Sequence, residues 1–130
     1  VANLRTSVYQ GCAESLAVMQ KYADKHGLTI EVLMQRDASP ISNIHSAEYA
    51  YVESCIRSHF PDIGIAPYVI MGGTDCRHFH ALTENALRFA PVRMNNQQNA
   101  SCHAVDENVT VTALAEGVEF FKKFLKGYQP

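Results

Sequence analysis

The chain has 130 residues, of which 47% are hydrophobic and 18% are charged. This length fits about one domain, and the composition excludes a disordered chain, a collagen and a coiled coil. The formal net charge of −2 provides no basic surface for nucleic acid or for an anionic membrane. No apolar run approaches the roughly 20 residues that cross a bilayer, so we expect neither nucleic acid nor a membrane as a partner.

The first third of the chain has the pattern of a β-α-β unit. Residues 2–9 alternate between apolar and polar side chains, which is typical of a half-buried strand. Helical spacing then predicts a helix over residues 12–26, with Gly27 placed as a left-handed cap. Alternation returns over residues 28–35 and predicts a second strand.

The middle of the chain indicates a largely parallel sheet. A polar connector at residues 36–43 is the best candidate for a domain boundary. An apolar stripe then predicts a helix over residues 46–59, which Pro61 ends. The apolar run 63–71 suits a strand buried on both faces, as in an α/β sheet covered by helices on both sides.

The last third ends in a long amphipathic helix. Residues 86–91 predict another short strand, and residues 94–103 form a polar loop rich in Asn and Gln. The closing helix begins at a cap, Thr110 or Thr112, and ends at Gly127. These elements together predict an α/β fold with a mostly parallel sheet flanked by helices.

The glycine-rich segment after the third predicted strand is the first candidate site. Glycines at Gly72 and Gly73 let backbone N–H groups approach a ligand, and Thr74 adds a hydroxyl. Arg77 provides a planar fork that can bind a carboxylate through two hydrogen bonds. A purely structural interpretation also fits: a glycine turn and a helix start, with Asp75 as first-turn acid and Arg77 in a surface ion pair.

His103 is the second candidate. It lies at the end of a polar loop, and Asp106 and Glu107 follow it closely, which suits a metal ligand with acidic support. One histidine does not make a site, however, and no HExxH or H-x-D pattern accompanies it. An ordinary loop histidine is the alternative interpretation.

A nucleophilic cysteine is the third possibility. Cys76 or Cys102 could attack a substrate, with His78, His80 or His103 as the base. Closeness in sequence is weak support for such a pair, because the partners usually meet only in space. A small, partly buried cysteine with no chemical role is the alternative.

The cysteines also bear on the compartment. Cys12, Cys55, Cys76 and Cys102 form no C-x-x-C pair, which argues against a zinc knuckle or a dithiol redox motif. A chain of this size can bury a core without disulfides. We therefore expect reduced thiols and a cytoplasmic protein.

Four short motifs, in order, resemble the C-terminal third of peptidase family M20. The likeness is to the branch of carboxypeptidase S, Gly-Xaa carboxypeptidase and the N-acyl-amino-acid hydrolases. The motifs are Asn3-Leu-Arg5, Gly72-Gly-Thr-Asp-Cys-Arg-His-Phe79, Arg88-Phe-Ala-Pro91 and His103-Ala-Val-Asp-Glu-Asn-Val109. The resemblance implies that residues 1–37 are the remnant of a ferredoxin-like lid or dimerisation domain. Residues 38–130 would then be the C-terminal part of a zinc-exopeptidase catalytic domain.

The resemblance also implies roles for individual residues. In such enzymes two zinc ions lie at the carboxyl end of the catalytic sheet, and His103 would be a ligand to one of them. Arg77 would bind the free carboxylate of a small peptide or an N-acyl amino acid, with Gly73 and Thr74 lining the same pocket. Asn3 would reach the substrate carboxylate or the developing oxyanion from the lid.

The family's remaining machinery is missing from this sequence. Its H-x-D motif, bridging aspartate, catalytic E-E pair and further carboxylate ligand are not present. The sequence also begins at Val1, without an initiator methionine, in a segment that resembles the middle of a strand. We therefore expect this chain to be a piece of a larger M20 zinc metallopeptidase. This piece alone should neither hydrolyse peptides nor retain zinc tightly. The alternative hypothesis is a truncated, non-catalytic α/β module that forms a homo-oligomer or binds a partner through exposed apolar faces.

Overall fold

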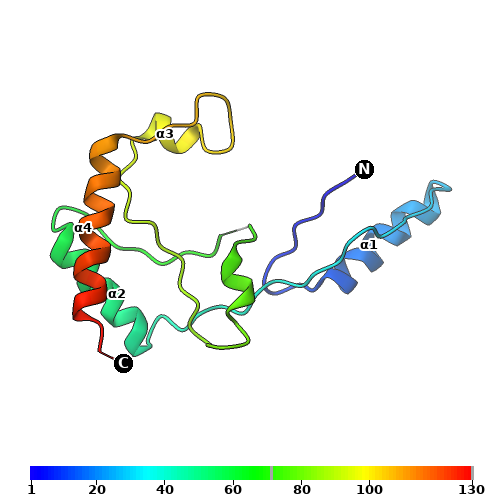
Figure 1. Cartoon of the computed structure of the whole chain (residues 1–130). Helices are drawn as coiled ribbons and strands as arrows, with labels where there is room; N and C mark the ends of the chain where they lie inside the picture. Colours follow the sequence, from blue (N-terminus) through cyan, green and yellow to red (C-terminus); the bar gives the residue numbers. More distant parts are fainter. Residues whose placement is uncertain (71, 130) are drawn as a thin grey trace. The chain divides into compact units, whose positions relative to one another are not determined.

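The computed structural model describes residues 1–70 and 72–129 in two compact units. Unit 1 comprises Val1–Asn43 and Pro67–Ala86, and unit 2 comprises Ile44–Ala66 and Leu87–Pro130. We describe each unit by itself. Figure 1 shows the helices, which are α1 (Cys12–Lys25), α2 (Ala47–His59), the short 3₁₀ helix η1 (Asp75–His78), α3 (Asn96–Ala100) and α4 (Val111–Gly127).

The structure confirms the three long predicted helices. Helix α1 matches the prediction over 12–26, and Gly27 has a positive φ of 63°, as a left-handed cap requires. Helix α2 begins after Ser46, whose side chain accepts a hydrogen bond from the backbone N–H of Tyr49. Thr110 caps α4 in the same way by accepting from Ala113 N–H at 3.2 Å.

The predicted α/β sheet is wrong. Across residues 1–70 and 72–129 no residue adopts a β-strand, so the segments 2–9, 28–35 and 86–91 are not strands. The predicted strand 63–71 is not one either in its described part, and its last residue, Met71, lies outside the described residues. The chain is helical instead, with irregular connections.

The reason is that an alternating pattern marks only which face of a strand would be buried. A strand also needs a neighbour that accepts and donates its backbone hydrogen bonds. Outside the helices, backbone hydrogen bonds here join residues close in sequence, as from Leu28 N–H to Ala23 O at 2.9 Å. The apolar side chains of the predicted strands consequently remain exposed, for example Leu4 at 54% and Met34 at 75%.

The core of unit 2 lies where α2 packs against α4, which run side by side in Figure 1. Ile56 and Phe60 from the end of α2 are buried against Phe120 of α4. The rings of Phe60 and Phe120 stack with centroids 6.0 Å apart. The backbone at Pro91 also lies close to α4, because a Cβ on Gly117 would lie 2.8 Å from the Pro91 carbonyl oxygen.

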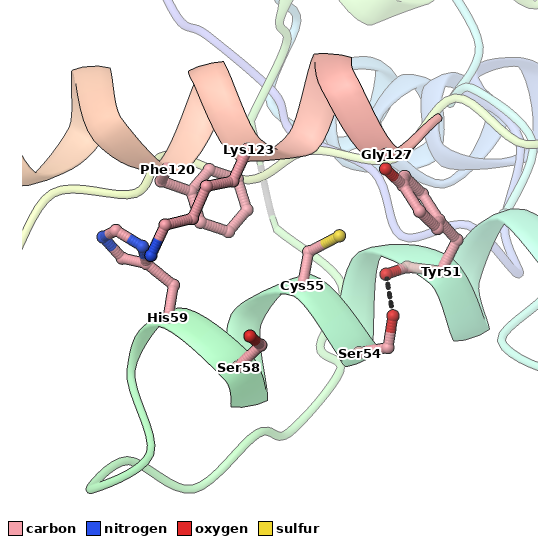
Figure 2. A pocket seen from close by; sticks show the side chains of 8 residues that line it. All are labelled: Tyr51, Ser54, Cys55, Ser58, His59, Phe120, Lys123 and Gly127. Atoms are coloured by element: carbon pink, nitrogen blue, oxygen red, sulfur yellow. Dashed lines mark hydrogen bonds between the residues drawn. The ribbon is translucent and has the colours of Figure 1, made fainter. Parts of the chain in front are cut away.

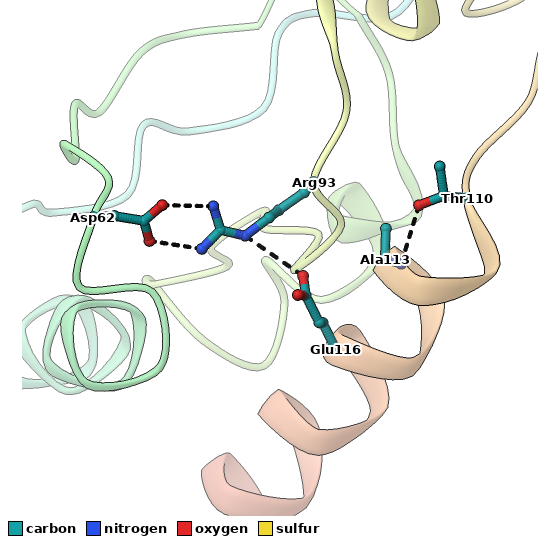
Figure 3. A network of polar contacts seen from close by, with 5 residues as sticks. All are labelled: Asp62, Arg93, Thr110, Ala113 and Glu116. Carbon is teal, nitrogen blue, oxygen red and sulfur yellow. Dashed lines mark hydrogen bonds and ion pairs between the residues drawn. The ribbon is translucent and has the colours of Figure 1, made fainter.

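A polar network beside this core joins three segments of unit 2 (Figure 3). The Arg93 guanidinium donates to both carboxylate oxygens of Asp62, at 2.8 and 2.7 Å, and lies 3.5 Å from Glu116 of α4. It also lies over the Phe60 ring, 4.9 Å from the centroid. The hydrogen bonds from Arg93 lower the pKa of Asp62 from 3.8 to about 2.

In unit 1, hydrogen bonds join segments that are far apart in the chain. The N-terminus of α1 is fixed by the backbone N–H of Cys12, which donates to the Asp37 carboxylate at 2.8 Å. The segment before α2 is tied to a later loop because Asn43 N–H donates to the side chain of Asn85 at 3.1 Å. Few of its side chains are buried, Ala23 and Ala86 among them. The predicted boundary between residues 37 and 38 remains a prediction.

No helix in the described part of the chain has the length and apolar character needed to cross a membrane.

Candidate functional site

In unit 1, the glycine-rich segment brings three predicted site residues together. Thr74 precedes the short helix η1, and its carbonyl oxygen accepts a hydrogen bond from Arg77 N–H at 3.2 Å. A Cβ on Gly73 would lie 3.5 Å from Nη1 of Arg77, so the guanidinium lies beside that glycine. The turn of η1 therefore folds the Arg77 side chain back beside Gly73, and the Arg77 backbone is bonded to Thr74.

The Arg77 side chain is exposed and oriented by its neighbour. Its Nε donates to Nε2 of His78 at 3.1 Å. Within residues 1–70 and 72–129 its two terminal nitrogens form no ion pair, so the surface ion pair of the structural interpretation is not formed there. These nitrogens are the ones that a carboxylate ligand engages.

Asn3 is not brought into this group. It is exposed in the N-terminal segment, and no hydrogen bond in the described part of the chain joins its side chain to Arg77. Arg5 of the same motif comes closer, because its Nη1 would lie 3.8 Å from a Cβ on Gly72. The sequence analysis did not single out Arg5, whose side chain lies near Gly72 only through a contact between segments far apart in the chain.

In unit 2, His103 lies in the loop between α3 and α4. Its side chain is exposed, and its backbone has a φ of +62°, an uncommon left-handed conformation for a residue other than glycine. Asp106 repeats this conformation with a φ of +63°. No hydrogen bond or ion pair within the described residues engages the His103 imidazole, so its nitrogens are available to a ligand.

The segment before His103 is more ordered than predicted. The polar loop predicted over residues 94–103 contains helix α3, which begins with a capping box. Asn95 accepts from Gln98 N–H at 2.8 Å, and the Gln98 side chain accepts from Asn95 N–H at 3.1 Å. The signal was present in the sequence as Asn95-x-x-Gln98, the spacing of a capping box.

The donor chemistry at His103 fits zinc, but the number of donors does not complete a site. An exposed imidazole is an ordinary zinc ligand, and catalytic zinc takes about three protein ligands. No group of three His, Cys, Asp or Glu side chains that could hold a metal occurs among residues 1–70 and 72–129. His103 therefore fits as one ligand of a larger set.

The nucleophilic-cysteine interpretation receives no support at Cys102. Its thiol contacts the backbone carbonyl of Gln98 at 3.8 Å and not a histidine. Cys76 lies half-buried in the first turn of η1. Arg77 and His103 belong to different units, so their convergence on one site stays a prediction.

A hollow of about 250 Å³ lies along the interface of α2 and α4 (Figure 2). Cys55 and His59 line it from α2, one helical turn apart, and Phe120 and Lys123 line it from α4. Tyr51 closes one end by donating its hydroxyl to the carbonyl oxygen of Phe124. Burial raises the pKa of Tyr51, which keeps its hydroxyl a donor. The hollow is part of the packing between two helices.

Comparison with known proteins identifies the class. The profile of Peptidase family M20/M25/M40 matches residues 6–127. That match covers both the Arg77 segment and the His103 loop. The chain belongs to this family.

Individual relatives agree with that assignment. The chain is 32% identical over 90 residues to "Probable carboxypeptidase S-like 2" of Dictyostelium discoideum, covering 69% of this chain and 17% of that protein. It is 30% identical over 129 residues to "N-fatty-acyl-amino acid synthase/hydrolase PM20D1" of Bos taurus, covering 97% and 26%. The chain thus spans about a sixth to a quarter of the length of these relatives. No solved structure matches it.

Proposed function

We propose that this chain is part of an M20 metallohydrolase that cleaves the amide next to a free carboxylate. The substrate would be a small peptide or an N-acyl amino acid, as the names of the relatives suggest. The observation that carries the proposal is the unbroken family match over residues 6–127, which includes both candidate segments.

Arg77 binds the substrate carboxylate in this proposal. The position of its guanidinium beside Gly73 supports the role, because a forked cation next to a residue without a side chain can be approached by a planar anion. Such an anchor positions the amide bond relative to the reacting groups. Asn3 from the N-terminal segment is the further contact expected from the family resemblance.

His103 serves as one metal ligand. When zinc is bound, it polarises the scissile carbonyl and lowers the pKa of a bound water. In this proposal the general base and the other ligands belong to the H-x-D and E-E motifs of the family, which are not in this sequence. By itself the chain would hold zinc weakly and would not hydrolyse amides.

The experiment uses the intact protein and a pair of substrates, one with a free carboxylate and one with that group blocked as an amide. Arg77→Ala should lower kcat/KM for the free acid roughly a hundredfold, since charge-assisted hydrogen bonds contribute up to about 3 kcal/mol. The blocked substrate should lose little.

The matched control is Arg57→Ala, which removes an exposed arginine paired with Glu53 on α2. This variant should retain the preference for the free acid. Equal losses on both substrates in Arg77→Ala would contradict the role of Arg77 as carboxylate anchor.

A further inference from the structure

We propose that Gln98 is the positioning residue for His103, holding the loop that presents the imidazole to the metal. The inference rests on the proposed function, because it takes His103 as a metal ligand. In this inference Gln98 contacts neither the metal nor the substrate and acts by holding the loop that carries His103.

The first observation is the burial of Gln98. Its relative exposure is 6%, which makes it the buried polar side chain among the described residues. A buried amide must have hydrogen-bond partners for both its oxygen and its nitrogen. Its Oε1 accepts from Asn95 N–H at 3.1 Å, and its Nε2 donates to Oδ1 of Asn108 at 3.2 Å.

The second observation is that these bonds close the loop. Gln98 and Asn108 are ten residues apart, and His103 lies midway between them. Asn108 continues the chain of bonds, because its Nδ2 donates to the backbone oxygen of Asp106 at 2.7 Å. The backbone oxygen of Gln98 also accepts from the Ser101 hydroxyl at 2.9 Å.

The third observation is the backbone conformation inside the closed loop. His103 and Asp106 both have positive φ values, 62° and 63°. Residues other than glycine adopt this backbone conformation at an energetic cost, so the surrounding hydrogen bonds must stabilise it. Opening the Gln98–Asn108 bond would let the loop relax and would displace the imidazole.

Glutamine is required because one end of its side chain accepts while the other donates. A glutamate at this position keeps the acceptor for Asn95 N–H but turns a carboxylate oxygen toward Oδ1 of Asn108. The Asn108 amide could rotate to donate to that oxygen, but it would then lose its bond to Asp106. Gln98→Glu therefore changes the loop with almost no change in side-chain shape.

The test uses the intact protein loaded with zinc or with cobalt(II). Gln98→Glu should weaken zinc binding at one site about 10- to 100-fold, the usual effect of losing a residue that orients a metal ligand. It should also shift the visible absorption bands of the cobalt-loaded protein and lower kcat. The KM for the free-acid substrate should change less than about twofold, because Arg77 is untouched. The control is Gln97→Glu, at an exposed position in the same helix, which should alter none of these.

Two further variants separate the possible failures. If Gln98→Glu does not fold, Asn108→Asp at an exposed position keeps the acceptor for Gln98 but loses the donor to Asp106. It should weaken zinc binding by a smaller factor and shift the cobalt bands in the same sense. Unchanged zinc affinity and cobalt bands in the folded variants would overturn the inference. His103→Ala tests the underlying function, since unchanged zinc binding there would overturn the ligand role itself.

Discussion

At the scale of residues, the sequence predicted contacts within one short segment but not contacts between distant segments. The grouping of Gly73, Thr74 and Arg77 could be predicted because all three lie in one five-residue segment, where chain connectivity alone keeps them close. The sequence could not show whether Asn3 or Arg5 lies nearer to this segment, since that depends on contacts between residues about 70 positions apart. The structure places Arg5, and not Asn3, beside the glycine pair.

The pair of Asp62 and Arg93 gives a prediction about pH. The pKa of Asp62 is about 2 in the folded chain, lowered from 3.8. The folded state therefore binds fewer protons here than the unfolded state, so the stabilisation is fully present above pH 3.8. It should be lost as the pH falls through about 2.

The measurement is chemical denaturation at several pH values between 5 and 2 in the wild type and in Asp62→Asn. The difference in unfolding free energy between the two should shrink as the pH falls through this window. In an Arg93→Gln background the Asp62 substitution should produce a smaller pH-dependent difference, because the Arg93 hydrogen bonds are the largest cause of the lowered pKa. A difference that is constant with pH would contradict the account.

At the scale of elements, helices could be predicted and strands could not. A helix satisfies its hydrogen bonds within its own segment, so periodicity and caps such as Thr110 define it locally. A strand depends on partners elsewhere in the chain. Periodicity did not, however, show which apolar side chains of α4 are buried. Gly117 and Phe120 are buried, whereas Val111, Val118 and Leu125 are exposed.

Gly117 tests the packing of α4. Alanine is favoured over glycine in a helix by about 1 kcal/mol, but its Cβ would lie 2.8 Å from the Pro91 carbonyl oxygen, a backbone atom that cannot rotate away. Overpacking of this kind costs about 1–3 kcal/mol. Gly117→Ala should therefore lower the free energy of unfolding despite the gain in helix propensity.

Thermal and denaturant unfolding of Gly117→Ala give the measurement. The matched control is Ala115→Gly, an exposed position on the same helix, which calibrates the propensity difference in α4. If Gly117→Ala instead stabilised the protein by about the amount that Ala115→Gly destabilised it, the close approach to Pro91 would be wrong.

At the scale of the whole molecule, family membership is established and the active site is a proposal. The family match covers residues 6–127, yet the chain spans only about a sixth to a quarter of the length of these relatives. Arg77 and His103 lie in separate units, and sequence patterns carry no information about how distant segments meet. Homo-oligomer formation through exposed apolar faces, such as that of α4, likewise stays a prediction.

The central claim is that position 77 holds the acid group of a substrate while position 103 holds a metal at the same site. Its most direct test is a crystal structure of the intact protein with zinc and a carboxylate product bound. The account predicts an imidazole nitrogen of His103 at about 2.0–2.1 Å from zinc. It also predicts the Arg77 guanidinium at about 2.7–2.9 Å from both product oxygens. Zinc bound without His103, or a product carboxylate held by other residues with Arg77 in solvent, would contradict it.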